Sequence, residues 1–418
     1  MAKNSVVMRT YPYRFHIALD GNGLNGLEGL AGVCQFLFDP ADDAYAWKIA
    51  YFDGIAGGHA VSVNAEGSIG FLGNTGQHLL LYDALDSREI GRQSTLAFET
   101  NDTSLRGSTH AVWLSEHEFV TAIGDYFYRF DARRLGFGER IGEHGVKLPH
   151  AIKRTASGRS LVYGSMDHPG SGEAREVGIF DLETGVARRI ELPATCWHVV
   201  ADARREVFYA VSFRVHPQGG RDWHEWAMAH LKEYAFEIDA ASGRVLRHWA
   251  AGRDIPAHIN SDVALSDSEL IFCTGASQTI MMIDRESLAR WRMIDERPDL
   301  GTLVDNRGAL AGQVTDALTR GNIVPDSRHF LAALRISRFA ILDSVYACQL
   351  SADQSLLFTA NRGLNHITVY DYPSNELRLR VKMPPLQEFV PASPHGDPRL
   401  GFHHGSLCSP KASYLRPG

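Results

Sequence analysis

Cysteine is scarce in this chain. Its 418 residues include only five cysteines, which are widely separated and form no C-x-x-C pair. Disulfide scaffolds and zinc ribbons depend on closely spaced pairs, so the sequence excludes both. We expect the five to be reduced residues of apolar strands, and they are Cys34, Cys196, Cys273, Cys348 and Cys408.

Long apolar runs and runs of basic residues are also absent. The N-terminus reaches charged residues before any stretch of signal-peptide length, and no apolar run reaches 18 residues. The formal net charge of -7 is spread along the chain, which gives no surface for phosphates. We therefore expect a soluble cytoplasmic protein without a membrane span or a nucleic-acid partner. The oligomeric state stays open.

Familiar catalytic motifs are missing as well. The chain contains no nucleophile elbow, P-loop, dinucleotide fingerprint, HExxH or EF-hand. The segment 20–29, DGNGLNGLEG, offers Asp20 and Asn22 but lacks the later acidic ligands of a calcium loop. We interpret it as a loop.

What the chain does have is a repeated phrase, a short apolar run that ends in aspartate. With 44% hydrophobic and 22% charged residues, the composition is that of a globular protein. The aspartates that end the phrase are Asp83, Asp131, Asp181, Asp239, Asp284 and Asp371, and the first five are 48, 50, 58 and 45 residues apart. A weakly polar strand precedes each phrase and a turn with a more charged strand follows it. A period near 50 with several short strands predicts the four-stranded blades of a propeller.

The repeat resembles the β-propeller superfamily of the YVTN and WD-repeat type over roughly residues 45–417, although Trp-Asp never stands where Tyr-Asp or Phe-Asp stands here. We predict an all-β fold, one seven-bladed propeller domain over residues 1–418, with eight blades as the alternative. Insertions are expected at about 214–233 and 296–328. The segment 402–415 is expected to supply the inner two strands of the last blade, and N-terminal strands near Phe36–Phe38 and Ala46–Phe52 to complete it. This closure removes the open sheet edge.

Histidines recur at one register of the predicted inner strands. His59, His110, His150 and His404 each stand five residues before a turn residue, and His198 fits with one residue missing. Inner strands line the channel of a propeller, so equivalent side chains of successive blades point toward one axis. Neutral imidazole is the commonest metal ligand, at roughly 2.0–2.1 Å. We predict a divalent transition metal here, with Fe(II) favoured and Mn, Cu or Zn as alternatives.

A structural role for these histidines is the competing interpretation. WD-type repeats carry a histidine that braces each blade, but it lies about nine residues before the turn. His258, eight residues before Ser266, fits that bracing position better than the axial one. Taken alone, any single histidine of this group is more often structural than functional.

The ring of histidines is similar to metal sites in two propeller families. Carotenoid-cleavage oxygenases hold Fe(II) with four histidines in seven blades, and propeller-type oligogalacturonate lyases place histidines around a metal. The resemblance extends to the fold and the ring only, since the surrounding motifs of those families are not found here. It implies oxygenase chemistry or metal-assisted lyase chemistry.

Loops at the mouth of the channel supply the other candidate residues. The insertion RVHPQGGRDWHEWAMAHLKE, residues 214–233, suits a lid over an organic substrate, and an interface helix is the equally favoured alternative. We assign acid–base roles to Asp167, His168 and His224, although a surface turn at Asp167-His168 remains the simpler interpretation. The predicted substrate contacts are His78, Arg221, Trp223, His258, Arg362, His366 and His395.

Three functional hypotheses follow. The first is a mononuclear metalloenzyme acting on a small organic molecule, with an Fe(II)-type oxygenase ranked slightly above a lyase or isomerase. The second is a non-catalytic propeller that binds a protein or peptide on its top face. The third is a metal-free enzyme that uses the histidine ring as a general base.

Overall fold

The computed structural model describes residues 10–20, 30–102, 106–166, 168, 174–212, 214–215, 234–250, 260–274, 279–296, 345–388 and 400–409. Apart from residues 214, 215 and 296, the two predicted insertions lie outside these residues. No helix capable of crossing a bilayer occurs in the part of the chain that is described.

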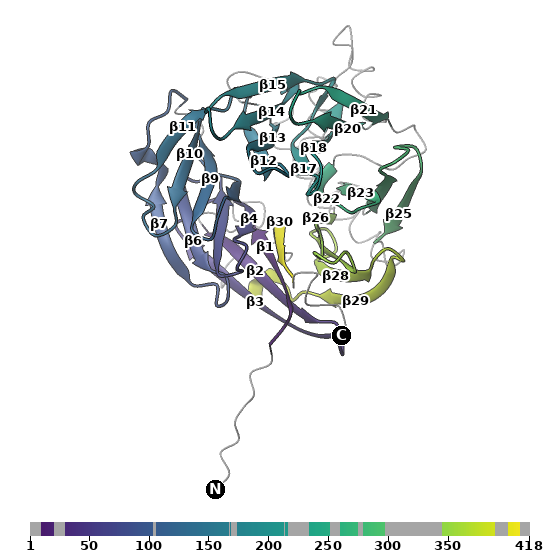
Figure 1. The fold of residues 1–418 in the computed structure, drawn as a ribbon. Coiled ribbons are helices and arrows are strands. Elements are labelled where there is room, and N and C mark those ends of the chain that lie inside the picture. Colours follow the sequence, from purple (N-terminus) through teal and green to yellow (C-terminus); the bar gives the residue numbers. More distant parts are fainter. Residues whose placement is uncertain are drawn as a thin grey trace, which may run out of the picture.

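Within the described residues the chain folds into a β-propeller of five four-stranded antiparallel sheets and one eight-stranded sheet, in which a single parallel bridge joins two more four-stranded blades. The sheets stand in a circle around a central axis (Figure 1). We number the blades from blade 1 to blade 7 in the chain order of their innermost strands. The inner strands are β4 (Gly58–Val63), β8 (Ala111–Trp113), β12 (Pro149–Arg154), β17 (His198–Ala201), β22 (Asn260–Leu265), β26 (Val345–Leu350) and β30 (Phe402–Cys408). The count agrees with seven blades and gives no eighth sheet among the described residues.

The remaining strands follow in the same blade order. The second strands are β5 (Ile69–Asn74), β9 (Glu118–Ile123), β13 (Ser160–Ser165), β18 (Val207–Val211), β23 (Glu269–Thr274), β27 (Leu356–Asn361) and β1 (Tyr13–Leu19). The third strands are β6 (His78–Asp83), β10 (Tyr126–Asp131), β14 (Glu176–Asp181), β20 (Tyr234–Asp239), β24 (Thr279–Asp284), β28 (His366–Asp371) and β2 (Leu30–Asp39). The outer strands are β7 (Glu89–Ser94), β11 (Glu139–Glu143), β15 (Ala187–Glu191), β21 (Val245–Ala250), β25 (Trp291–Asp295), β29 (Glu376–Lys382) and β3 (Ala44–Asp53).

Smaller elements complete the described fold. Strands β16 (Ala194–Thr195) and β19 (Arg214–Val215) form a two-stranded pair beside blade 4. Two short 3-10 turns occur at Thr95–Ala97 and Leu386–Glu388.

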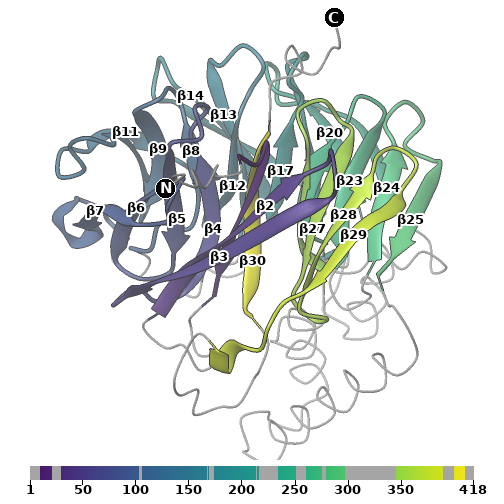
Figure 2. The same cartoon turned by 90° about the horizontal axis from the view of Figure 1, so that it is seen from below.

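Blade 7 closes the ring by joining the two ends of the chain. Strand β30 pairs with β1, with Phe15 opposite Leu407, and a single parallel bridge from His404 to Ala60 links β30 to blade 1. Figure 2 shows β30 in yellow beside the purple N-terminal strands. The predicted pairing of N- and C-terminal strands is confirmed. The predicted division of two C-terminal and two N-terminal strands is wrong, because one C-terminal strand and three N-terminal strands form the blade. The additional N-terminal strand is Tyr13–Leu19, whose seven residues are almost all buried.

Apolar strands pack face to face between neighbouring blades. At the closure, Phe15 and Phe38 of blade 7 meet Phe358 of blade 6 edge to face, with ring centroids 5.9 Å apart in both pairs. Second and third strands such as β5 and β6 are therefore mostly buried, whereas an outer strand such as β7 contains no buried residue. This difference explains the charged fourth strand of the repeat.

The recurring aspartate has a local role in turns. Asp181 Oδ1 accepts hydrogen bonds from the backbone N–H groups of Glu183 and Thr184, both at 2.9 Å, and so fixes the turn into the outer strand. Asp39 does the same for Ala41 at 3.0 Å and is the equivalent residue of blade 7. The phrase therefore marks blade geometry and carries no part of the axial site.

Candidate metal centre

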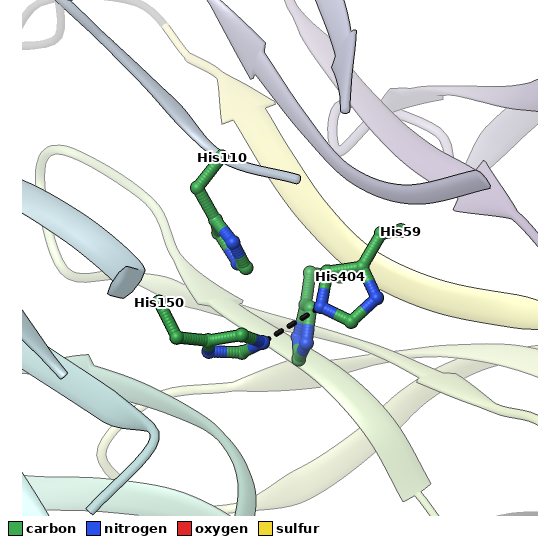
Figure 3. A group of neighbouring side chains, drawn as sticks. All are labelled: His59, His110, His150 and His404. Carbon is green, nitrogen blue, oxygen red and sulfur yellow. Dashed lines mark hydrogen bonds between the residues drawn. The ribbon is translucent and has the colours of Figure 1, made fainter. Parts of the chain in front are cut away.

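Four of the registered histidines meet on the propeller axis. His59 lies in β4, His110 directly before β8, His150 in β12 and His404 in β30. Each of these histidines has one ring nitrogen that lies within 4.8 Å of a ring nitrogen of each of the other three. Figure 3 shows the four rings turned toward one another. We call this set the histidine cluster.

The rings of the histidine cluster are in close contact. The Nε2 atoms of His59 and His150 are 2.7 Å apart, and the ring centroids of His110 and His150 are 4.1 Å apart. Two nitrogens bound to one metal at 2.0–2.1 Å are at most about 4.2 Å apart, so the cluster is close to the size of a coordination sphere.

His198 extends the cluster on one side. Its ring centroid is 4.8 Å from those of both His150 and His404. It also belongs to a second group with Asp262 and His404, whose possible ligand atoms are again within 4.8 Å of one another. His404 is therefore shared by the two groups.

Burial keeps these imidazoles neutral. Burial lowers the pKa of His59 and of His198 to about 3. For His110, His150 and His404, burial first and the neighbouring histidines second hold the pKa well below its usual range. Neutral imidazole is the form that binds metals, because the lone pair is then free.

Two observations show how the nitrogens are disposed. His150 Nδ1 donates to the carbonyl oxygen of Trp197 at 3.0 Å, which leaves the lone pair on Nε2, the atom that faces His59. Both ring nitrogens of His404 are buried and have no hydrogen-bond partner. Unpartnered buried nitrogens are costly in a protein and are common where a ligand is missing. The residues present thus fit a divalent metal.

The structure adds residues that sequence reasoning missed. His403 lies with its ring centroid 4.1 Å from that of His59 and is only 6% exposed. Asp262 and Tyr346 occupy the equivalent positions of blades 5 and 6, four and five residues before the turn residues Ser266 and Ser351. The register that predicts the axial histidines therefore also marks these two positions, although neither holds a histidine.

Asp262 adds the only carboxylate of this ring among the described residues. Burial raises its pKa to about 6, against the stabilising effects of Lys153 and of the backbone N–H groups of Cys348 and Val263. Its Oδ1 lies 4.0 Å from His404 Nδ1. At this distance the two groups do not hydrogen bond, so Asp262 is a candidate donor of a ligand atom beside His404 and does not fix its ring.

A small cavity continues along the axis beyond the histidines. Its volume is about 40 Å³, and its lining includes His110, His198 and His404 together with Ser62, Lys153, Asp262 and Gln349. This is room for about one water-sized molecule, since a water occupies about 30 Å³ in the liquid.

The predicted acid–base residues are only partly described. Asp167 and His224 lie outside the described residues. His168 Nε2 lies 2.6 Å from Asp102 Oδ2, and its side chain is 11% exposed. His168 follows β13, whose last residue pairs with Pro149 next to His150, so the His168–Asp102 pair is at the same end of the blades as the histidine cluster.

The predicted substrate contacts have different surroundings. His78 begins β6 and is partly buried, with Nδ1 unpartnered. His366, in blade 6, is buried and lies 3.1 Å from the buried carboxylate of Glu296, which directly follows outer strand β25 of blade 5. Arg362 is 1% exposed and lies close to Tyr346. Arg221, Trp223, His258 and His395 lie outside the described residues.

Comparisons with known proteins bear on the fold alone. No family model matches the chain, and no curated protein matches it. Many solved structures resemble it, and two of them share 12% sequence identity with it. One is the dihydro-heme d1 dehydrogenase NirN in complex with DHE, with a TM-score of 0.50 and coverage of 96% of this chain and 76% of that chain. The other is hydrazine synthase of Kuenenia stuttgartiensis, with a TM-score of 0.52 and coverage of 79% and 87%. Enzymes are thus among the proteins that share this propeller fold.

Proposed function

We propose that the protein is a mononuclear metal-dependent enzyme that acts on a small organic substrate at the propeller axis. The observation that carries the proposal is the histidine cluster, in which four neutral imidazoles from four blades place ring nitrogens within 4.8 Å of one another. A structural role does not account for it, because neither ring nitrogen of the buried His404 has a partner.

The donor set favours a transition metal. Neutral nitrogen ligands suit Fe, Cu, Mn or Zn better than Mg or Ca, which prefer oxygen. The resemblance of the cluster to the four-histidine iron site of carotenoid-cleavage oxygenases favours Fe(II), and with it an oxygenase. His198 and Asp262 flank the cluster and are further candidate donors.

The chain's own residues hold and orient the site. The Trp197 carbonyl accepts from Nδ1 of His150 and so fixes the tautomer and the plane of that ring. The burial of His150, His198 and His404, each at most 5% exposed, excludes bulk water from one side of the site. A bound divalent metal would supply a Lewis acid for a carbonyl oxygen of the substrate or, if it is Fe(II), a redox centre for dioxygen chemistry.

A lyase or isomerase is the second candidate, and the His168–Asp102 pair favours it. A histidine 2.6 Å from a carboxylate is a common proton-transfer unit. It lies at the same end of the blades as the histidine cluster. In that case His168 would move the proton, and a metal held by the histidine cluster would supply stabilisation of negative charge on the substrate.

Metal analysis of protein purified without a histidine tag tests the proposal. We expect near-stoichiometric Fe, Mn, Cu or Zn in the wild-type protein and its loss in His110→Ala and His150→Ala. His117→Ala is the matched control, because His117 lies on the turn at the opposite end of β8 and its side chain is 35% exposed. A metal-free wild-type protein, or unchanged metal content in the two cluster variants, contradicts the proposal.

A further inference from the structure

A buried arginine next to the histidine cluster has hydrogen-bonding capacity that the described protein does not use. Arg362 follows β27, is 1% exposed and is among the largest fully buried side chains. Its Nη2 donates to Asp20 Oδ2 across a long 3.4 Å. Its Nε and Nη1 have no partner. Buried charged groups are normally satisfied by several short hydrogen bonds, so this one lacks partners.

The geometry of guanidinium leaves a complete two-donor edge open. Nη2 carries two hydrogens, and a single contact with Asp20 uses one of them. The other hydrogen of Nη2 is parallel either to the Nε–H bond or to one Nη1–H bond, depending on which hydrogen Asp20 accepts. Both Nε and Nη1 are unpartnered, so two parallel donors are free in either case. A planar two-oxygen anion matches such an edge with two parallel hydrogen bonds.

The hairpin that carries Arg362 is held in place on both sides. Asn361 Nδ2 donates to Glu296 Oε2 at 2.8 Å, and Asn361 Oδ1 accepts from the backbone of Leu364 at 2.8 Å. Asn365 Oδ1 accepts from the backbone N–H of Leu400 at 3.0 Å. The position of Arg362 is therefore fixed before any ligand arrives, which lowers the entropic cost of binding.

Arg362 also lies close to the metal-binding rings. Its guanidinium carbon is 6.0 Å from the centroid of the Tyr346 ring. The same tyrosine ring lies 4.3 Å from the His403 ring and 5.2 Å from the His404 ring. The Tyr346 ring thus contacts both the guanidinium of Arg362 and the His404 ring of the histidine cluster.

We propose that Arg362 binds a carboxylate group of the substrate, so that the substrate is a small carboxylic acid whose reacting part lies at the histidine cluster. The position of the reacting part of the substrate at the histidine cluster rests on the proposed function, whereas carboxylate binding by Arg362 does not. A carboxylate is favoured over a phosphate because Asp20, already paired with Arg362, repels a doubly charged anion more strongly.

Calorimetric titration with matched probes tests the inference. Acetate and benzoate are compared with their neutral isosteres acetamide and benzamide, and with inorganic phosphate. We expect the two carboxylates to bind at millimolar concentration and the amides not to bind. Arg362→Gln and Arg362→Lys are expected to weaken carboxylate binding about 10- to 100-fold, because lysine keeps the charge but loses the two-donor edge.

A chelator-treated sample separates this inference from the proposed function. If carboxylate binding is lost when the metal is removed but is unchanged in the Arg362 variants, the inference is overturned and the proposed metal site is not. Carboxylate binding that depends on Arg362 in a protein that binds no metal supports the subsite and contradicts the metalloenzyme. Preference for phosphate, equal binding of the amides, or no binding of either carboxylate overturns the inference.

Crystals of the wild-type protein provide a test that does not depend on folding of the variants. Soaked 4-bromobenzoate should give a bromine anomalous peak whose carboxylate contacts Arg362. A peak elsewhere, or none, overturns the inference.

Discussion

His150 Nδ1 and the carbonyl oxygen of Trp197 are joined by a hydrogen bond of 3.0 Å between blade 3 and blade 4. The bond fixes which nitrogen of His150 carries the proton and points the other toward His59, 2.7 Å away. Packing between blades therefore sets the orientation of the His150 ring at the axis. If the proposed metal binds there, a disturbance of this packing should lower its occupancy without changing any of the proposed ligands.

Gly164→Ala should cause such a disturbance. A Cβ atom at Gly164 would lie 2.1 Å from the Trp197 carbonyl oxygen, so the backbone of blade 4 must shift. We expect a loss of roughly 1–3 kcal/mol in the free energy of unfolding and reduced metal occupancy. Denaturant unfolding and metal analysis measure the two effects. Gly136→Ala is the matched control, because its Cβ would meet only the Gln93 side chain at 3.5 Å. Full metal occupancy in Gly164→Ala would contradict this role of Trp197.

His404→Leu should separate metal binding from stability. Since neither ring nitrogen of His404 has a partner, leucine removes no hydrogen bond and relieves a desolvation cost of about 1–3 kcal/mol. We expect the metal-free variant to be at least as stable as the metal-free wild type. Added metal should stabilise the wild type by about 2.7 kcal/mol at 100 times the dissociation constant, and should not stabilise the variant. Thermal unfolding with and without metal measures both effects. If the metal-free variant is less stable than the metal-free wild type, the His404 nitrogens do have partners in the protein.

Acid should destabilise the metal-free protein through its buried histidines. His198 is 2% exposed, and burial lowers its pKa from 6.5 to about 3. Between these two values the unfolded chain binds the proton and the folded protein does not, so the free energy of unfolding falls as pH falls from about 6.5 toward 3. The expected slope is about 1.4 kcal/mol per pH unit for each such histidine.

Urea unfolding of the chelated protein at a series of pH values measures this slope. His198→Asn should reduce the slope, whereas His117→Asn on the surface should leave it unchanged. A flat profile between pH 5 and 6.5 is incompatible with buried neutral histidines.

The propeller could be predicted because its signals are local. A strand, its turn aspartate and the next strand recur along the chain, as at Asp83 and Asp181, and each turn is satisfied by hydrogen bonds within a few residues. The division of blade 7 was harder to predict, because pairing between Phe15 and Leu407 is a contact between opposite ends of the chain. No local pattern reports such a contact.

The candidate site was only partly predictable. The turn register located His59, His110, His150 and His404, because equivalent positions of successive blades face one axis. Restricting that register to histidine missed Asp262 and Tyr346, which stand at the equivalent positions of their blades. His403 lies next to a registered residue and faces the cluster through its contact with His59, 4.1 Å between ring centroids.

The sequence by itself determined the repeat, the blades and the heights at which the histidines stand, because these depend on the spacing of residues within a single blade. The tertiary structure alone decided which nitrogens face one another, that the Trp197 carbonyl orients His150, and that two donors of Arg362 are buried without a partner. Those properties arise when the ring closes, because closure brings residues from distant blades to one axis and removes water from them.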